Sequence, residues 1–268
     1  MAKIDPRWTE GSAYNIIQEL AIGFQKSQIL FTAVKLDIFT VIDDVPKTVV
    51  ELSNLLQANT KFLERLLDAL VSIKLLDKQC NSYSNTELSA KHLIKTSKDY
   101  YGYLSHNSNL WESWGTLYDV IKKGKIQSDI PINDKPELWI ANYLESCDYR
   151  SKLQMEDVLK LFPEMVNFEK MLTLGIGSMR YTIEIAKLYP NIDIYRFDAP
   201  NVINILEKKL KTEYDGNKIY FLKGDITKDD LGSNYNCIYI ETILQNYSVL
   251  ENIQILKKYI IHWQKAVN

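Results

Sequence analysis

Apolar positions along the first 160 residues recur at helical spacing, which predicts an almost wholly helical amino-terminal half. The first long segment carries an apolar stripe made of Ile16, Ile17, Leu20, Phe24, Ile29, Phe31 and Val34. A later helix over 60–74 places one apolar face inward, consisting of Leu63, Leu66, Leu67 and Leu70. Between them, Thr48-Val-Val-Glu51 has the spacing of a capping box, in which hydroxyl and carboxylate each accept a backbone N–H. This predicts a short helix over 47–56.

The segment after the second helix changes character. LLDKQCNSYSNTELS places an Asn-Ser cluster between two strand-like pieces, which predicts a small β-hairpin. Helix, turn, helix and hairpin in this order are typical of a winged helix. Winged helices often bind DNA, but Lys61, Arg65 and Lys74 are nearly balanced by Glu64 and Asp68. We therefore favour a packing or dimerisation module and keep a DNA-binding regulator as an alternative.

A further helix is expected over 100–125. It is rich in aromatic residues, namely Tyr101, Tyr103, Trp111, Trp114 and Tyr118. Aromatic residues at helical spacing usually belong to a core, and some can line a pocket for a planar ligand.

From about residue 171, short apolar runs alternate with helical segments. Strands are predicted at 171–174, 192–197, 219–222 and 237–240, and helices at 181–189, 202–210 and 250–263. This alternation indicates βαβ units and a parallel sheet, with the strand order 3-2-1-4. The predicted fold class is α/β, with a helical winged-helix-like amino-terminal domain followed by a Rossmann-like domain.

Composition narrows the classes of function. The 268 residues are 46% hydrophobic and 25% charged, as in ordinary globular proteins. A net charge of −2 disfavours nucleic acid and anionic membranes as partners. Cys80, Cys147 and Cys237 form no CxxC pair, which predicts a reducing compartment and no metal site. The chain shows no signal core and no long apolar span, so we expect a cytoplasmic protein without membrane contact.

The loops that follow the predicted strands carry candidate chemistry. Gly175-Ile-Gly177-Ser178 runs into a helix, whose free N–H groups suit an anion, and its glycines allow a tight turn. Asp198 closes the second strand about 20 residues later, where a ribose hydroxyl would be bound. Asp225, after the third strand, is placed to accept from an adenine amino group. Glycines also end strands without binding anything, and Arg180 stands where a dinucleotide site would need a third glycine. The pattern favours an adenosine ligand.

Several motifs carry a family resemblance over nearly the whole chain. FDAPNVI is similar to a Phe-Asp-Leu-Pro-x-Val-Ile segment, KGDIT to a Gly-Asp-Met/Phe segment, and LQNYSVLENIQILKK to a His-Asp-Trp-Ser-Asp-Glu…Ile-Leu-Lys segment. LTLGIG and the helix from Trp114 to Lys125 fit the same pattern. With these motifs the chain resembles the S-adenosylmethionine-dependent O-methyltransferases of the plant hydroxylated-aromatic and bacterial polyketide-tailoring type.

The resemblance implies a domain plan and partners. It implies a winged-helix dimerisation domain over 1–100, a helical substrate-pocket region over 101–165 and an S-adenosylmethionine-binding domain over 166–268. It implies a homodimer that methylates the oxygen of a small molecule in specialised metabolism. Gly175 and Gly177 would pass the methionine part of the cofactor, and Asp198 would hold the ribose. Ala199 and Ile226 would sandwich the adenine, with Asp225 beside it.

Three positions depart from the family pattern. Thr173 replaces the acidic residue before the glycine loop, Met179 replaces the loop's last glycine, and Gln245 replaces the catalytic histidine. Gln245 can hydrogen-bond a substrate but cannot take its proton, so a neutral alcohol should react poorly and an acidic phenol or unprotonated amine better. Glu241 and His106 are candidate substitute bases. The alternative is a catalytically silent family member that binds a ligand or partner.

The family continues after the fourth strand with three more strands and a helix, whereas this sequence has one predicted helix there. By this resemblance the Rossmann-like domain is truncated, and the fourth strand would lie at the edge of the sheet. We expect the edge of the fourth strand to be covered, because unpaired strand edges invite aggregation. Either the final helix crosses it and buries Tyr239, Ile253, Ile260 and Trp263, or a second chain supplies the missing strands. The alternative is that the chain is a fragment.

Overall fold

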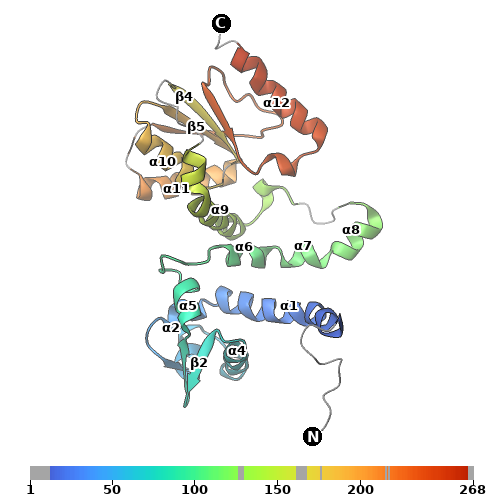
Figure 1. Ribbon diagram of the computed structural model, residues 1–268, viewed down its shortest axis with the longest axis vertical. Coiled ribbons are helices and arrows are strands. Elements are labelled where there is room, and N and C mark those ends of the chain that lie inside the picture. The colour runs from blue at the N-terminus through green and yellow to red at the C-terminus, as the bar shows by residue number, and fades with distance from the viewer. Residues whose placement is uncertain are drawn as a thin grey trace. The chain divides into compact units, whose positions relative to one another are not determined.

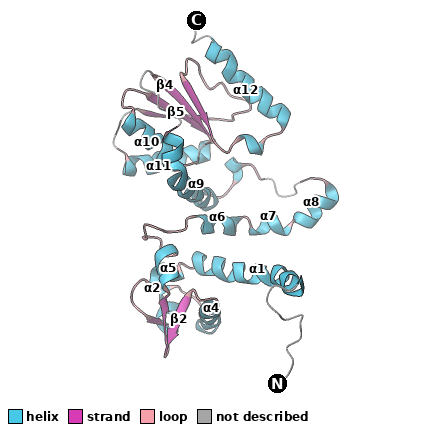
Figure 2. Cartoon of the chain, in the orientation of Figure 1, coloured by secondary structure: helices cyan, strands magenta, loops and turns pink. Residues whose placement is uncertain are grey.

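The structure is a computed structural model that describes residues 13–125, 130–160, 168–175, 177–214, 216 and 218–264, with the side chains of 13–15, 212, 213 and 259–264 excepted. The chain divides into two compact units after Ser108. Figure 1 shows the helices and strands of each unit, and Figure 2 separates them by type.

The amino-terminal unit combines helices with a small antiparallel sheet in the order β1-β3-β2. Its elements are α1 (Ala13–Lys35), α2 (Ile38–Ile42), β1 (Lys47–Thr48), α3 (Val49–Leu55), α4 (Thr60–Ser72), β2 (Leu76–Gln79), β3 (Ser82–Asn85) and α5 (Glu87–His92), with α6 (Tyr103–Asn109) at the boundary. The capping box is present at α3, where Glu51 N–H donates to Thr48 Oγ1 and Thr48 N–H donates to the Glu51 carboxylate. The predicted order of helix, helix and hairpin is confirmed.

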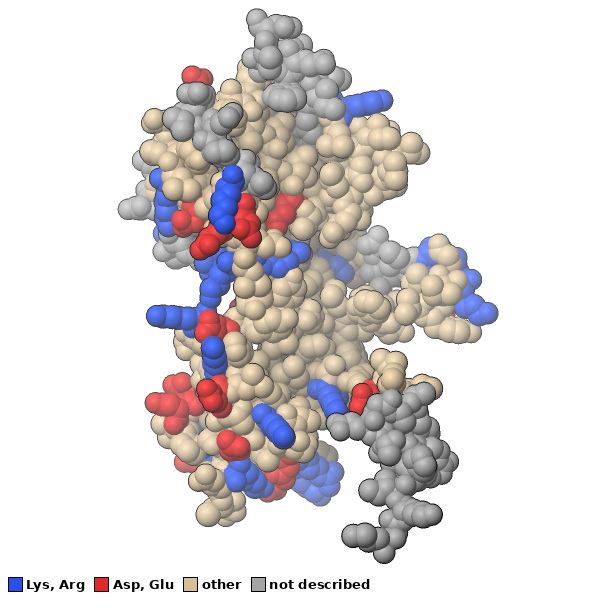
Figure 3. Space-filling model, in the orientation of Figure 1, with Lys and Arg blue, Asp and Glu red and all other residues tan. Residues whose placement is uncertain are grey.

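The surface of this unit is mixed in charge and partly apolar. On the face that Figure 3 shows, Lys and Arg lie among Asp and Glu without forming a basic stripe. The stripe predicted on α1 divides: Val34 belongs to the core, whereas Leu20 is 78% exposed and Phe24 53% exposed. This exposed part of α1 is the kind of surface that a dimerisation module presents.

The aromatic segment after residue 100 forms three short helices instead of one: α6, α7 (Trp111–Gly115) and α8 (Leu117–Lys123). Trp114 is 68% exposed and Tyr118 is 73% exposed. For these two residues a core position is therefore wrong.

The carboxyl-terminal unit is built on a four-stranded parallel sheet in the order β6-β5-β4-β7. In chain order, the elements after α8 are η2 (Ile132–Asp134), α9 (Glu137–Leu159), β4 (Lys170–Leu174), α10 (Arg180–Leu188), β5 (Asp193–Asp198), α11 (Pro200–Glu213), β6 (Ile219–Lys223), β7 (Cys237–Ile240), η4 (Leu244–Asn246) and α12 (Val249–Gln264). The predicted order 3-2-1-4 is confirmed, and so is the α/β class.

Alternating side chains of the strands supply two cores, one on each face of the sheet. Leu172 and Phe197 pack with Ile255 of α12. Met171 and Ile194 point to the other face and pack with residues of α10. Polar residues whose side chains point to the same face as Met171 and Ile194 therefore lie in an interior covered by helices.

Helix α12 packs on one face of the sheet through Ile255. Ile255 is 1% exposed, but Ile253 is 44% exposed. Tyr239 contacts Tyr181 of α10, on the opposite face, with ring centroids 5.8 Å apart. Tyr239 points to the face of β7 opposite to Ile238 and Ile240, which belong to the cluster under α12. The expectation that α12 buries Tyr239 and Ile253 together is therefore wrong. Ile260 and Trp263 lie outside the described side chains, and cover by a second chain stays a prediction.

Candidate functional site

The first residues of the loops after β4 and β6 are hydrogen-bonded to the end of β5. Gly175 N–H donates to the carbonyl of Phe197 at 3.4 Å, and Gly224 N–H donates to the carbonyl of Asp198 at 3.1 Å. The loops after β4, β5 and β6 therefore meet at the carboxyl ends of the strands, where ligands bind in open α/β sheets.

Two glycines shape the loop after β4. Gly175 has φ +61° and Gly177 has φ +68°, a region that side chains with a Cβ rarely adopt. A Cβ on Gly175 would lie 2.7 Å from the Cβ of Ile243, and one on Gly177 would lie 2.6 Å from the Sγ of Cys147. Both glycines are thus required by contacts within the protein. They fix the path of the loop, whereas the polar groups around the loop are what indicate a ligand.

Ser178 ends this loop and is braced from helix α9. Its Oγ donates to Asp148 Oδ1 at 2.6 Å and accepts from Arg180 N–H at 3.1 Å. Asp148 also pairs with Lys209 of α11. Because Ser178 is fully buried, these bonds hold the loop against α9 and α11.

Asp198 lies at the end of β5, with its side chain 13% exposed. Its Oδ1 accepts from Ala199 N–H at 2.9 Å, and its Oδ2 lies 4.0 Å from Arg196 Nη2. Burial raises the pKa of Asp198, while the Arg196 charge and the Ala199 N–H oppose that rise. The carboxylate therefore lies next to Phe197, whose carbonyl accepts from Gly175 N–H, and the ribose contact of Asp198 stays a prediction.

Arg196 was not anticipated from the sequence. It is 1% exposed, and its Nη1 donates to the carbonyl of Ser178 at 2.5 Å and to Thr182 Oγ1 at 3.3 Å. Three buried polar atoms near it make no hydrogen bond within the described part of the chain: Arg196 Nε, Arg196 Nη2 and Thr173 Oγ1. Thr173 is the register partner of Arg196 across β4 and β5. The only sequence signal was a charged residue inside an apolar strand.

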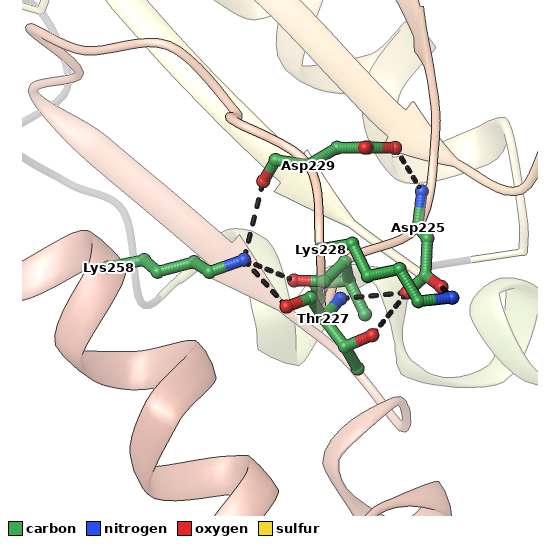
Figure 4. Close-up of polar contacts among 6 residues, drawn as sticks. Asp225, Thr227, Lys228, Asp229 and Lys258 are labelled. Atoms are coloured by element: carbon green, nitrogen blue, oxygen red, sulfur yellow. Dashed lines mark hydrogen bonds and ion pairs between the residues drawn. The ribbon is translucent and has the colours of Figure 1, made fainter.

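Asp225 organises the turn after β6 (Figure 4). Its Oδ1 accepts from Thr227 N–H at 2.9 Å and from Thr227 Oγ1 at 2.6 Å, and its Oδ2 pairs with Lys228 at 2.8 Å. These bonds lower the pKa of Asp225 to about 2. Lys258 points from α12 to the same turn and donates to the carbonyls of Ile226, Thr227 and Asp229. The proposed adenine contact of Asp225 stays a prediction.

The predicted adenine sandwich is not tested by these contacts. Ala199 is half-buried and packs in the cluster that contains α9 residues. Ile226 is 3% exposed and packs in the cluster under α12, on the opposite face of the sheet.

Tyr247, which follows η4, is a further residue that sequence reasoning missed. It is half-buried, and burial raises its pKa, with the charges of Asp225 and Asp198 adding to the rise. The signal available in the sequence was its place in the LQNYS motif.

The two candidate catalytic residues have different surroundings. Glu241 is half-buried just after β7 and accepts a hydrogen bond from Tyr239 Oη at 3.2 Å. Burial raises the pKa of Glu241, opposed by that hydrogen bond and by the charges of Arg150 and Arg196. Gln245 lies in η4 and is exposed. His106 lies in α6, in the other unit.

Within the described ranges, no group of three or more His, Cys, Asp or Glu side chains is placed to hold a metal ion. None of the helices described is long and apolar enough to cross a bilayer.

The chain thus combines a helical unit with a Rossmann-like domain that has a glycine loop and a carboxylate at the carboxyl ends of its strands. Residues 18–95 match the family model of the O-methyltransferase dimerisation domain, and residues 132–263 match that of the O-methyltransferase domain. The chain belongs to this O-methyltransferase family, which confirms the resemblance seen in its motifs.

Individual relatives agree with this assignment. Human acetylserotonin O-methyltransferase is 30% identical over 246 residues, covering 83% of this chain and 69% of that protein. An uncharacterised protein of Methanocaldococcus jannaschii is 26% identical over 228 residues, covering 81% of this chain. This chain spans 60% of that relative's length. A crystal structure of human N-acetylserotonin methyltransferase in complex with SAM superimposes with a TM-score of 0.73 at 25% identity, covering 94% of this chain and 76% of that one.

Proposed function

We propose that this protein is an S-adenosylmethionine-dependent methyltransferase that methylates an oxygen of a small molecule in specialised metabolism. The observation that carries the proposal is the buried carboxylate of Asp198 beside the braced glycine loop. Two buried donors of Arg196 nearby, Nε and Nη2, make no hydrogen bond within the described part of the chain. Family membership and the SAM complex of the human relative support the same cofactor.

The residues at the strand ends suit this cofactor. Asp198 accepts the ribose hydroxyls, and the loop from Gly175 to Gly177 passes the methionine part. Ala199 and Ile226 flank the adenine, with Asp225 beside it. When bound, the cofactor supplies a methyl group on a positively charged sulfur, and the protein's contribution is alignment of the acceptor with that methyl.

The proton of the acceptor needs a base, which typically contributes about 10²–10⁴-fold to the rate. Gln245 can accept or donate a hydrogen bond but cannot take a proton. Glu241 is a carboxylate whose pKa is raised by burial, so it is a stronger base than an exposed glutamate. We therefore assign proton removal to Glu241 and acceptor positioning to Gln245.

We further propose a cytoplasmic homodimer formed through the amino-terminal unit. The exposed apolar residues of α1 supply a surface for this contact. Cys80, Cys147 and Cys237 are unbridged, as the reducing cytoplasm favours. Light scattering should give twice the chain mass at micromolar concentration, and a monomer would contradict the dimer.

Calorimetry with S-adenosylmethionine and with its demethylated product tests the function. We expect both to bind the wild type, and Asp198→Ala to lose binding. Asp193→Ala is the matched control, because Asp193 begins the same strand and pairs with Lys218 at 3.6 Å. It should bind as the wild type does.

Absence of heat with the wild type would contradict the cofactor assignment and favour the silent family member that binds a partner. A salt-dependent shift with duplex DNA would instead support the regulator.

A further inference from the structure

We propose that Arg196 is a positioning residue of the cofactor site, which holds the glycine loop through the carbonyl of Ser178 and places a positive charge beside the carboxylate of Asp198. This inference rests on the proposed function, because it concerns the residue expected to bind the ribose. It adds a role to a strand residue that the family motifs do not include.

Arg196 lies where its charge must be compensated. A guanidinium that is 1% exposed is costly to bury unless it is paired and hydrogen-bonded. Nη1 donates to the Ser178 carbonyl and to Thr182 Oγ1, so this end of the guanidinium holds the glycine loop in place. Nη2 faces Asp198 Oδ2 at 4.0 Å, an electrostatic contact without a direct hydrogen bond. The Asp198 carboxylate can therefore still accept hydrogen bonds from a ligand, and the positive charge of Arg196 lies close to it.

The charged and titratable groups around this pair come from several elements. Helix α9 contributes Tyr143, Cys147 and Arg150, and the segment after β7 contributes Glu241. The charge of Asp198 contributes to the raised pKa of Tyr247, after burial and the charge of Asp225. Arg150 donates to Cys147 Sγ at 3.1 Å, and its charge also lowers the pKa of Glu241.

Arg196 is the principal charge that offsets the burial of Asp198. Burial raises the pKa of the Asp198 carboxyl, and Arg196 is the largest influence that lowers it. A carboxylate accepts hydroxyl protons better than a carboxylic acid does, so binding of the ribose should weaken as the pH falls through this pKa. Removing the charge of Arg196 should raise that pKa further and move the loss of binding to higher pH.

The two roles of Arg196 can be separated by substitution. Arg196→Met removes both the charge and the hydrogen bonds at similar length. Arg196→Lys keeps the charge, but its single nitrogen cannot reproduce the fork that reaches Ser178 and Asp198 together. Arg180→Met is the matched control, because Arg180 is exposed at the start of α10.

The experiment is a calorimetric titration of the demethylated cofactor between pH 5.5 and 8.5, with folding checked by circular dichroism. We expect Arg196→Met to move the pH midpoint of binding upward by about one to three pH units, the effect of an adjacent arginine on an aspartate. A midpoint that moves by one pH unit corresponds to about tenfold weaker binding on the acid side. Arg196→Lys should keep the wild-type midpoint but bind more weakly at every pH, and Arg180→Met should follow the wild type.

An unchanged midpoint in a folded Arg196→Met protein would overturn the inference, and so would an equal loss of affinity at all pH values. Should this variant fail to fold, Arg196→Gln supplies a neutral side chain that still donates to Ser178, with the same expected change in midpoint. A wild type that binds at no pH would overturn the proposed function together with this inference. A wild type that binds with the same profile as Arg196→Met would overturn this inference alone.

Discussion

Substitution of Gly177 by alanine tests the packing of the glycine loop directly. Two separate penalties are expected. The left-handed backbone at φ +68° costs about 1–2 kcal/mol for a residue with a Cβ. The new Cβ would also lie 2.6 Å from Cys147 Sγ, and overpacking of this kind costs about 1–3 kcal/mol. The sum is a loss of about 2–5 kcal/mol in the free energy of unfolding.

Gly124→Ala is the control for the backbone penalty. Gly124 ends α8 with φ +67°, and no atom lies within 4 Å of a Cβ built there. Gly124→Ala should therefore suffer only the backbone penalty, a loss of about 1–2 kcal/mol in the free energy of unfolding. Cys147→Ala in the Gly177→Ala background removes the Sγ and should recover part of the second penalty.

Urea unfolding followed by tryptophan fluorescence measures these differences, since both glycines lie in the carboxyl-terminal unit. Equal losses for Gly177→Ala and Gly124→Ala would refute the close approach of α9 to the loop. The close approach would also be refuted if adding Cys147→Ala to Gly177→Ala recovered none of the lost free energy of unfolding.

Three other predictions concern the base, a turn and the last helix. Glu241→Gln should lower kcat at least about 10²-fold with unchanged affinity for the demethylated cofactor, whereas Gln245→Ala should mainly raise KM for the acceptor; equal kcat in both would contradict the assignment. The depressed pKa of Asp225 contributes stability that is present above its ordinary pKa of 3.8 and is lost as the pH falls through about 2, so the stability difference between wild type and Asp225→Asn should shrink over that range in urea titrations. Ile255→Ala should cost about 2–5 kcal/mol of unfolding free energy and Ile253→Ala about 1 kcal/mol or less, and the reverse order in thermal melts would place α12 differently.

Local patterns in the sequence predicted most of the fold. The capping box at Thr48 and Glu51 involves residues three apart, so its geometry follows from the chain itself. The strands of the sheet were predicted because buried parallel strands are short apolar runs separated by helices. Their order followed from the right-handed connections that such units require. Asp198 could be named as a candidate because the strand end where it lies is the usual place for a ligand.

Features that depend on the pairing of distant segments were not predicted. The role of Arg196 arises only when β5 lies beside β4 and under the Ser178 carbonyl. The contact of Tyr239 with α10 depends on which face of β7 meets which helix, and a one-residue change in phase reverses that. The exposure of Trp114 depends on what packs against its helix, which periodicity alone does not contain.

Ile243 lies against Gly175 so closely that a single added carbon would not fit between them. The segment after β7, expected to face the acceptor, and the loop after β4, expected to face the cofactor, are therefore mechanically coupled. Neither can be displaced toward the other, and outward movement of Ile243 removes the support of Gly175. We therefore expect a bulkier side chain at position 243 to disturb the cofactor side of the site as well as the acceptor side.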